Sequence, residues 1–202
     1  MQADDCMSNV TFYAAQRTGI PPNSLKRNYQ ANITRAQFAE LMVQTIELNG
    51  GELPKGAAFS DCSYDYVLKA RAAGIVSGTG NNQFSPNASI TRQQLVVMLM
   101  NAVKYMQQTG DYGGYYDPDN ENKALFADVG DWAKNAVRAA YAQGMIQGNA
   151  SGLNPNGNAT CEQSIIMVWR AAQLCLGYDG QIAQDILALA PITKALAKRW
   201  DV

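Results

Sequence analysis

Two arginines stand at the same position in two predicted helix openings. Arg35 follows Thr34, Arg92 follows Thr91, and each Thr has Gln three residues later. This spacing is a capping box, which predicts that each Thr is the N-cap and each Arg the first helical residue. A cation there faces the positive end of the helix dipole, at a cost of roughly a few tenths of a kcal/mol or more. The recurrence of Arg at this position therefore indicates a role in binding an anion.

These arginines could bind either of two anionic partners. A guanidinium beside free N–H groups of a helix N-terminus would suit the carboxylate of a ligand. Alternatively, each Arg forms an ion pair with an Asp of a neighbouring unit, such as Asp61 or Asp128. The two roles are compatible with each other.

The capping boxes belong to a longer internal repeat. A Phe-x-Asp opening is followed by an Ala-rich amphipathic stretch ending in Gly, a Gly-containing turn, a polar turn ending in Pro, and a capping box. In one copy these motifs are Phe59-Ser60-Asp61, Ile75 to Gly78, Phe84-Ser85-Pro86 and the capping box at Thr91. In the next copy they are Phe126-Ala127-Asp128, Met145 to Gly148, Leu153-Asn154-Pro155 and the capping box at Thr160. The third capping box has Cys161 in place of Arg, and the first copy matches mainly in its second half. Units of this kind must pack on each other to bury their apolar faces.

Helical periodicity dominates the chain, and the predicted fold is all-α. Apolar stripes follow the capping boxes, and the Met-rich segment after Thr91 is apolar on nearly every side, as suits a helix buried among others. No sheet is expected, although short β-bridges are expected around Gly78 and Phe84. The predicted helices span Asn9–Thr18, Thr34–Leu48, Tyr64–Ala73, Thr91–Gln108, Trp132–Gln143 and Thr160–Leu176.

The ordered motifs resemble the S-layer homology (SLH) family over roughly residues 4–176. The resemblance implies three tandem helical-hairpin repeats that form a pseudo-threefold unit around a central helical bundle, with ligand grooves between neighbouring repeats. Family members bind secondary cell-wall polymers, commonly pyruvylated, and hold proteins on the outside of bacterial cells. The expected divisions are 1–50 for a degenerate first repeat, 51–108 for the second, 109–125 for a linker, 126–176 for the third and 177–202 for a helical tail.

The resemblance and the residues together predict a non-catalytic anchor that binds a secondary cell-wall polysaccharide at the cell surface, as a monomer. The alternative is a structural or protein-interaction module whose grooves are degenerate. We expect repeat two to be the most intact, so that a ligand at Arg92 also touches the turn from Gly78 to Phe84. The predicted ligand-binding residues are Arg35, Arg92, Thr34, Thr91, Asp61, Asp128, Gly78 and Phe84.

Composition excludes several other functions. The net charge of −1 gives no broad basic field for nucleic acid. No apolar run approaches the roughly 20 residues of a membrane span, and no secretory signal is visible, so an exported protein would be present here as a fragment or mature form. The absence of His excludes Ser-His and Cys-His nucleophiles. A carboxylate pair for glycoside hydrolysis stays open, but Asp61 and Asp128 repeat in equivalent positions, which is not typical of a catalytic pair.

Neither the acidic linker nor the cysteines predict a metal site, and no cofactor is expected. Asp117, Asp119 and Glu121 alternate in the linker, but Asn122 stands where an EF-hand loop needs Gly, so we expect no useful calcium affinity. The four cysteines lack C-x-x-C spacing, which disfavours structural zinc. Disulfides and buried free thiols both remain open for Cys6, Cys62, Cys161 and Cys175. A bond between the last two is disfavoured because one helix would hold them roughly 21 Å apart, against a Cα limit near 7 Å.

Overall fold

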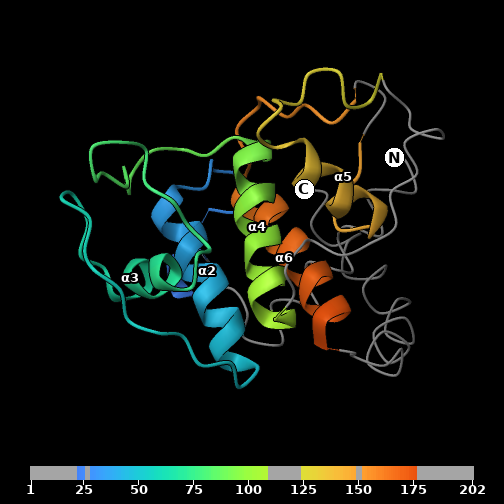
Figure 1. Ribbon diagram of the computed structural model, residues 1–202. Helices are drawn as coiled ribbons and strands as arrows, with labels where there is room; N and C mark the ends of the chain where they lie inside the picture. Colours follow the sequence, from blue (N-terminus) through green and yellow to red (C-terminus); the bar gives the residue numbers. More distant parts are fainter. Residues whose placement is uncertain (1–21, 26–27, 109–123, 149–151, 177–202) are drawn as a thin grey trace, which may run out of the picture.

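The computed structural model describes residues 22–25, 28–108, 124–148 and 152–176 (Figure 1). Within these ranges the chain is helical and its β-structure is confined to isolated bridges, which confirms the all-α prediction. The helix predicted over Asn9–Thr18 and the tail from 177 to 202 lie outside the described residues. The elements are the 3₁₀ helix η1 (Asn23–Leu25) and the α-helices α2 (Arg35–Leu48), α3 (Asp65–Ala72), α4 (Arg92–Gln107), α5 (Lys134–Ala142) and α6 (Cys161–Leu176).

The capping boxes predicted for α2 and α4 are confirmed. Thr34 Oγ1 accepts a hydrogen bond of 3.2 Å from the Gln37 N–H, and Gln37 Oε1 accepts one of 3.0 Å from the Thr34 N–H. The pair Thr91 and Gln94 repeats this exchange at 3.4 and 3.1 Å. Before α6 the same reciprocal bonds join Thr160 and Gln163, at 3.2 and 3.3 Å. An N-cap of this kind contributes about 1 kcal/mol, so each helix start is fixed locally.

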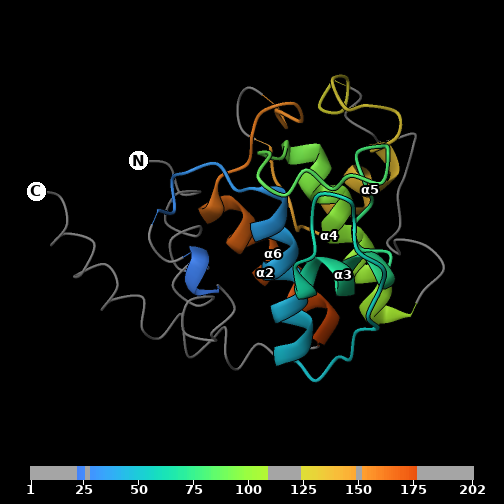
Figure 2. The ribbon, with the colours of Figure 1, turned by 90° about the vertical axis from the view of Figure 1, so that its left-hand side faces the viewer.

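The three capped helices form the centre of the molecule. α2, α4 and α6 contact one another pairwise, and Figures 1 and 2 show α4 and α6 lying side by side. α3 packs on α2, and α5 packs on α4. Each short helix therefore packs on the capped helix that precedes it in the chain. The fully buried side chains at the centre include Phe38, Leu41, Leu95, Leu99, Met100 and Ile165.

Backbone hydrogen bonds close a ring just before the capped helices. The Ile33 N–H donates to the Ala159 carbonyl at 2.9 Å, the Ala159 N–H donates to the Ile90 carbonyl at 3.0 Å, and the Ile90 N–H donates to the Ile33 carbonyl at 3.3 Å. All three residues are fully buried. The ring ties the starts of α2, α4 and α6 together in cyclic order. A pseudo-threefold relation among the three units remains a prediction, which this ring supports.

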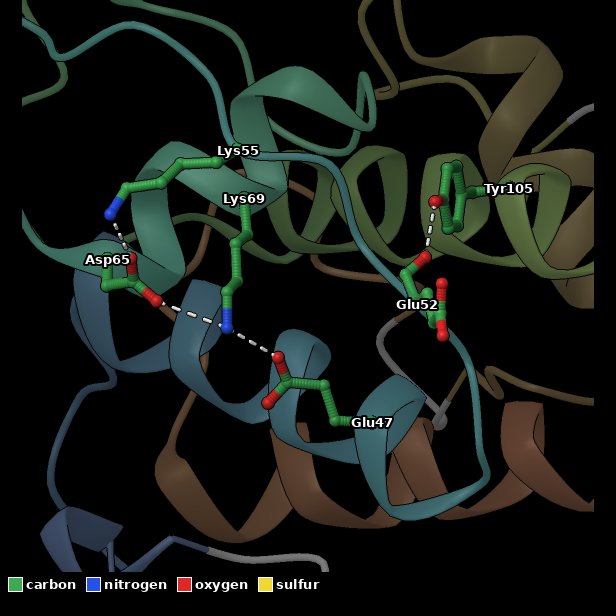
Figure 3. Close-up of polar contacts among 6 residues, drawn as sticks. All are labelled: Glu47, Glu52, Lys55, Asp65, Lys69 and Tyr105. Atoms are coloured by element: carbon green, nitrogen blue, oxygen red, sulfur yellow. Dashed lines mark hydrogen bonds and ion pairs between the residues drawn. The ribbon is translucent and has the colours of Figure 1, made fainter.

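At the other end of the bundle, polar contacts attach α3 and the segment before it (Figure 3). Lys69 of α3 lies 2.7 Å from Glu47 of α2 and 3.1 Å from Asp65, which in turn lies 3.0 Å from Lys55. Tyr105 of α4 donates a hydrogen bond of 2.7 Å to the Glu52 carbonyl. Because exposed ion pairs contribute little to stability, burial of the apolar residues is the main force holding α3 in place.

The cysteines, metal binding, membrane spanning and the acidic linker were the other features considered in the sequence. Cys62, Cys161 and Cys175 are free thiols, the first two buried, and Cys6 lies outside the described residues. Within the described ranges, no Cys, Asp and Glu side chains gather in a group that could hold a metal ion, and no helix is both long and apolar enough to cross a bilayer. Most of the acidic linker, residues 109–123, lies outside those ranges, so its predicted lack of calcium affinity stays a prediction.

Candidate functional site at the starts of the capped helices

The helix N-termini do not offer free N–H groups, which corrects one premise of the anion-site prediction. In α2 the Arg35 N–H donates to the Ala88 carbonyl at 2.9 Å, and the Ala36 N–H donates to the Pro86 carbonyl at 3.0 Å. The third amide, that of Gln37, donates to the Thr34 hydroxyl. The first two amides of the other capped helices are used in the same way, Arg92 with Gly157, Gln93 with Pro155, Cys161 with Ala31 and Glu162 with Tyr29. These termini therefore hold the loop of a neighbouring unit.

Arg35 holds the turn between residues 77 and 84 of the second unit. Its Nε donates to the Phe84 carbonyl and its Nη2 to the Ser77 carbonyl, both at 2.8 Å. The guanidinium also lies over the Phe84 ring, 4.8 Å from its centroid, and only 9% of the residue is exposed. Burial lowers the pKa of Arg35, and the nearby charge of Asp61 opposes that shift. Arg35 therefore acts as an internal clamp between two units.

Asp61 supports the same turn from its other side. Its two carboxylate oxygens accept hydrogen bonds from the Phe84 N–H at 2.7 Å and the Ser85 N–H at 2.8 Å. The bond from Phe84 is the largest cause of the lowered pKa of Asp61. No ion pair links Arg35 or Arg92 to an Asp within the described part of the chain. The carbonyl groups of the turn, and not a carboxylate, are the direct partners of Arg35.

The stabilising effect of Asp61 should depend on pH. Its folded-state pKa lies below the ordinary value of 3.8, so its contribution is complete above that value and is lost as the pH falls through the folded pKa. We expect the stability difference between the parent and Asp61→Asn to shrink in this acid range, as measured by urea denaturation from pH 6 to about pH 2.

Asp128 supplies the matched control. It is exposed, and its carboxylate accepts no hydrogen bond from the described residues. Asp128→Asn should therefore lower the free energy of unfolding at pH 6 by less than Asp61→Asn does. An equal loss of stability from both substitutions would refute the role assigned to Asp61.

Arg92 makes a looser version of the Arg35 contacts. Its Nε donates to the Leu153 carbonyl at 3.0 Å, and its Nη2 reaches the Gln147 carbonyl at 3.4 Å. The residue is half-buried, and burial alone lowers its pKa, with no carboxylate acting in the opposite direction. Leu153 replaces the aromatic ring that lies under Arg35. Arg92 thus has more accessible surface and a weaker second bond, and no carboxylate of the described residues compensates its charge.

The predicted site residues divide between two places. The Gly78–Phe84 turn lies against Arg35, so the structure does not place it beside Arg92 as the sequence analysis expected. Gly78 is needed there because a Cβ atom would lie 2.8 Å from the Gln83 carbonyl oxygen and 3.1 Å from the Phe59 ring. The hydroxyls of Thr34 and Thr91 act as helix caps.

Sequence reasoning missed a polar network beside Arg92. Gln93 is 8% exposed, donates to Asn156 Oδ1 at 2.6 Å, and accepts the Gly130 N–H at 2.9 Å. Asn156 Nδ2 reaches the Asp128 carbonyl at 3.4 Å. The only sequence signal was the contrast between Gln93 and Ala36 at the equivalent helix position. This network joins α4 to both segments that flank α5.

The family model of the S-layer homology domain matches residues 60–96 and 126–162. The chain carries S-layer homology domains. The two matched segments include Asp61, Asp128, Arg92 and the turn that Arg35 holds. Domains of this family are non-catalytic modules that anchor surface proteins to the cell wall, which assigns the chain to the bacterial cell surface.

Similar curated proteins are large, and the match covers a small part of each. The chain is 30% identical to an endoglucanase of Bacillus sp. (strain KSM-635), over 70% of this chain and 15% of the relative. It is 31% identical to an amylopullulanase of Thermoanaerobacterium thermosulfurigenes, over 66% of this chain and 7% of the relative. It is 27% identical to the surface-layer 125 kDa protein of Lysinibacillus sphaericus, over 70% of this chain and 12% of the relative. A similar region is thus present in an endoglucanase, an amylopullulanase and a surface-layer protein.

Proposed function

We propose that this SLH region binds an acidic secondary cell-wall polysaccharide, with a pyruvylated glycan as the expected ligand, and thereby anchors the protein that contains it. The observation that carries the proposal is the state of Arg92. Its guanidinium is half-buried between two units, and no carboxylate within the described residues offsets its charge. A partly desolvated guanidinium favours a carboxylate partner, since charge-assisted bonds are roughly twice as strong as neutral ones.

The groove at Arg35 is a weaker candidate for the same ligand. Two of its nitrogen atoms already donate bonds of 2.8 Å to backbone carbonyls, and the side chain is almost fully buried. The negative charge of Asp61 lies close enough to act on Arg35. Both features reduce what Arg35 can offer to an anion, so we assign it mainly to packing between units.

The competing function is a structural or protein-interaction module, and one observation favours it. The first three N–H groups of each capped helix already have partners within the chain. If the arginines serve only to lock the units together, the grooves need no ligand. The two functions predict different behaviour toward purified cell walls.

A sedimentation assay with sacculi of the producing bacterium tests the proposal. We expect the purified chain to pellet with intact sacculi and to stay in solution after the secondary polymer has been extracted from them. Chemical reduction of the polymer's carboxyl groups should weaken pelleting by about tenfold or more, since a charge-assisted bond is lost. Equal pelleting with extracted and intact sacculi would reject the polymer as the ligand.

A further inference from the structure

A third arginine, Arg71 of α3, lines an open pocket that neither Arg35 nor Arg92 lines. The pocket has a volume of about 530 Å³ and is lined mainly by Phe59, Arg71, Ser77, Gly78, Gly80 and Asn82. A volume of this size is within the usual range for a small-ligand site. Arg71 played no part in the sequence-based site prediction.

The Arg71 guanidinium is held in one orientation but keeps unused donors. It lies over the Phe59 ring at 4.0 Å from the centroid, and its Nη1 donates to the carbonyls of Ala58 at 2.9 Å and Ala57 at 3.3 Å. Its Nε and Nη2 donate to no acceptor within the described residues, and no carboxylate pairs with it there. A planar fork fixed in this way is pre-organised for a carboxylate.

The turn beside Arg71 adds backbone donors. The N–H groups of Ser77, Gly78, Gly80 and Asn82 donate to no acceptor in the part of the chain that the structure describes. The Ser77 carbonyl points to Arg35, so the Gly78 N–H of the same trans peptide points away from Arg35. Asp61, which supports this turn, has both carboxylate oxygens bonded to backbone N–H groups. The residues that line the pocket therefore carry a positive charge and four backbone N–H groups that have no acceptor among the described residues.

Phe84 and Phe59 connect the two arginines. Their rings stack with centroids 5.2 Å apart, Arg35 lies over Phe84, and Arg71 lies over Phe59. Arg35 thereby fixes the turn from inside the protein, while Arg71 lines the open pocket that residues of the same turn also line. This contact series explains how the pocket can keep its shape without a ligand.

We propose that this pocket binds a carboxylate-bearing sugar of the wall polysaccharide, with the free nitrogen atoms of Arg71 on the carboxylate and the turn amides on sugar oxygens. The inference rests on the proposed function and adds a subsite separate from Arg92. A single guanidinium with a planar fork matches a carboxylate, which is also planar and carries one charge. Guanidinium forks also bind phosphate, so the assignment to a carboxylate follows from the proposed function, and the test below separates the two anions.

Calorimetric titration of the chain with purified wall polysaccharide tests this subsite. Arg71→Ala and Asn82→Asp should each weaken binding by about tenfold, the loss expected for one charge-assisted bond. Asn82→Asp places a negative charge in the pocket and leaves Arg71 in place. Asn82 has a left-handed φ of 55°, a conformation that Asp also tolerates well. Arg71→Lys should lose most of the same affinity, because Lys lacks the fork.

The control is Arg138→Ala, at the arginine 5.9 Å from the Phe126 ring in the third unit, which should bind like the parent. Carboxyl reduction also removes the proposed partner of Arg92, so carboxyl-reduced polymer should bind the parent more weakly than native polymer binds Arg71→Ala. With that reduced polymer the parent and Arg71→Ala should bind equally weakly, because the Arg71 effect depends on the carboxylate. If the parent binds native polymer and both Arg71→Ala and Asn82→Asp match it, the subsite is wrong while the proposed function stands. If the parent does not bind, the proposed function itself fails.

Two other results would also overturn the subsite. One is an Arg71 effect that survives carboxyl reduction but disappears when phosphate esters are removed from the polymer, which would identify a phosphate ligand. The other is a loss of affinity in Arg71→Ala that accompanies a lowered melting temperature, with Asn82→Asp binding like the parent.

Discussion

Arg35→Ala should lower the free energy of unfolding by about 3 kcal/mol. The substitution removes two bonds of 2.8 Å from a charged group to the carbonyls of Phe84 and Ser77, each worth about 1.5–3 kcal/mol. It also removes the guanidinium from above the Phe84 ring. Because Arg35 is 9% exposed, water can replace these contacts only in part. Urea denaturation monitored by circular dichroism would measure the loss.

Arg92→Ala is the matched comparison for stability. Its second bond is long, at 3.4 Å, no aromatic ring of the described residues lies beneath it, and the residue is half-buried. We expect it to lower the free energy of unfolding by about 1.5 kcal/mol, the low end of the range for one hydrogen bond from a charged group, here that of Nε to the Leu153 carbonyl. Equal losses for the two variants would contradict the distinction drawn between a buried clamp and an accessible arginine.

The sequence predicted those features whose causes are local. A Thr with Gln three residues later defines a helix start wherever it stands, and the predicted starts of α2, α4 and α6 are confirmed. Apolar spacing likewise predicted the stripes that bury Phe38 and Leu95. The order of the repeated motifs, which resembles that of SLH domains, indicated the family. The short helix η1 was not predicted, because its segment matches no other copy of the repeat.

The sequence could not predict which repeats contact each other. Each capped helix and each turn carries similar local signals in every unit, so the assignment of Arg35 to the turn of the second unit depends on how the units close into a ring. The same closure uses the helix N–H groups that had been expected to be free. Asp61 and Asp128 also look equivalent in sequence, yet only Asp61 has hydrogen-bonded carboxylate oxygens among the described residues.

Arg92→Ala should weaken binding to the wall polysaccharide by about tenfold or more while the chain stays folded. The variant loses the charge that would meet a ligand carboxylate, and a charge-assisted bond of about 1.5–3 kcal/mol corresponds to a change of roughly tenfold to more than a hundredfold in affinity. Calorimetric titration with the purified polymer measures the affinity, and thermal melting of the same samples measures folding.

Arg35→Ala supplies the control for binding, with the opposite expected pattern of a large loss of stability and, in conditions where it remains folded, a smaller loss of affinity. The reason is that Arg35 has its Nε and Nη2 donors bonded inside the protein and Asp61 close by. Arg92 has a weak second bond and, in the part of the chain that the structure describes, no carboxylate beside it. Parent-like binding by both variants would place the anchoring residues elsewhere. Unfolding of Arg92→Ala would show that its contacts with Leu153 and Gln147 serve mainly to join the second and third units.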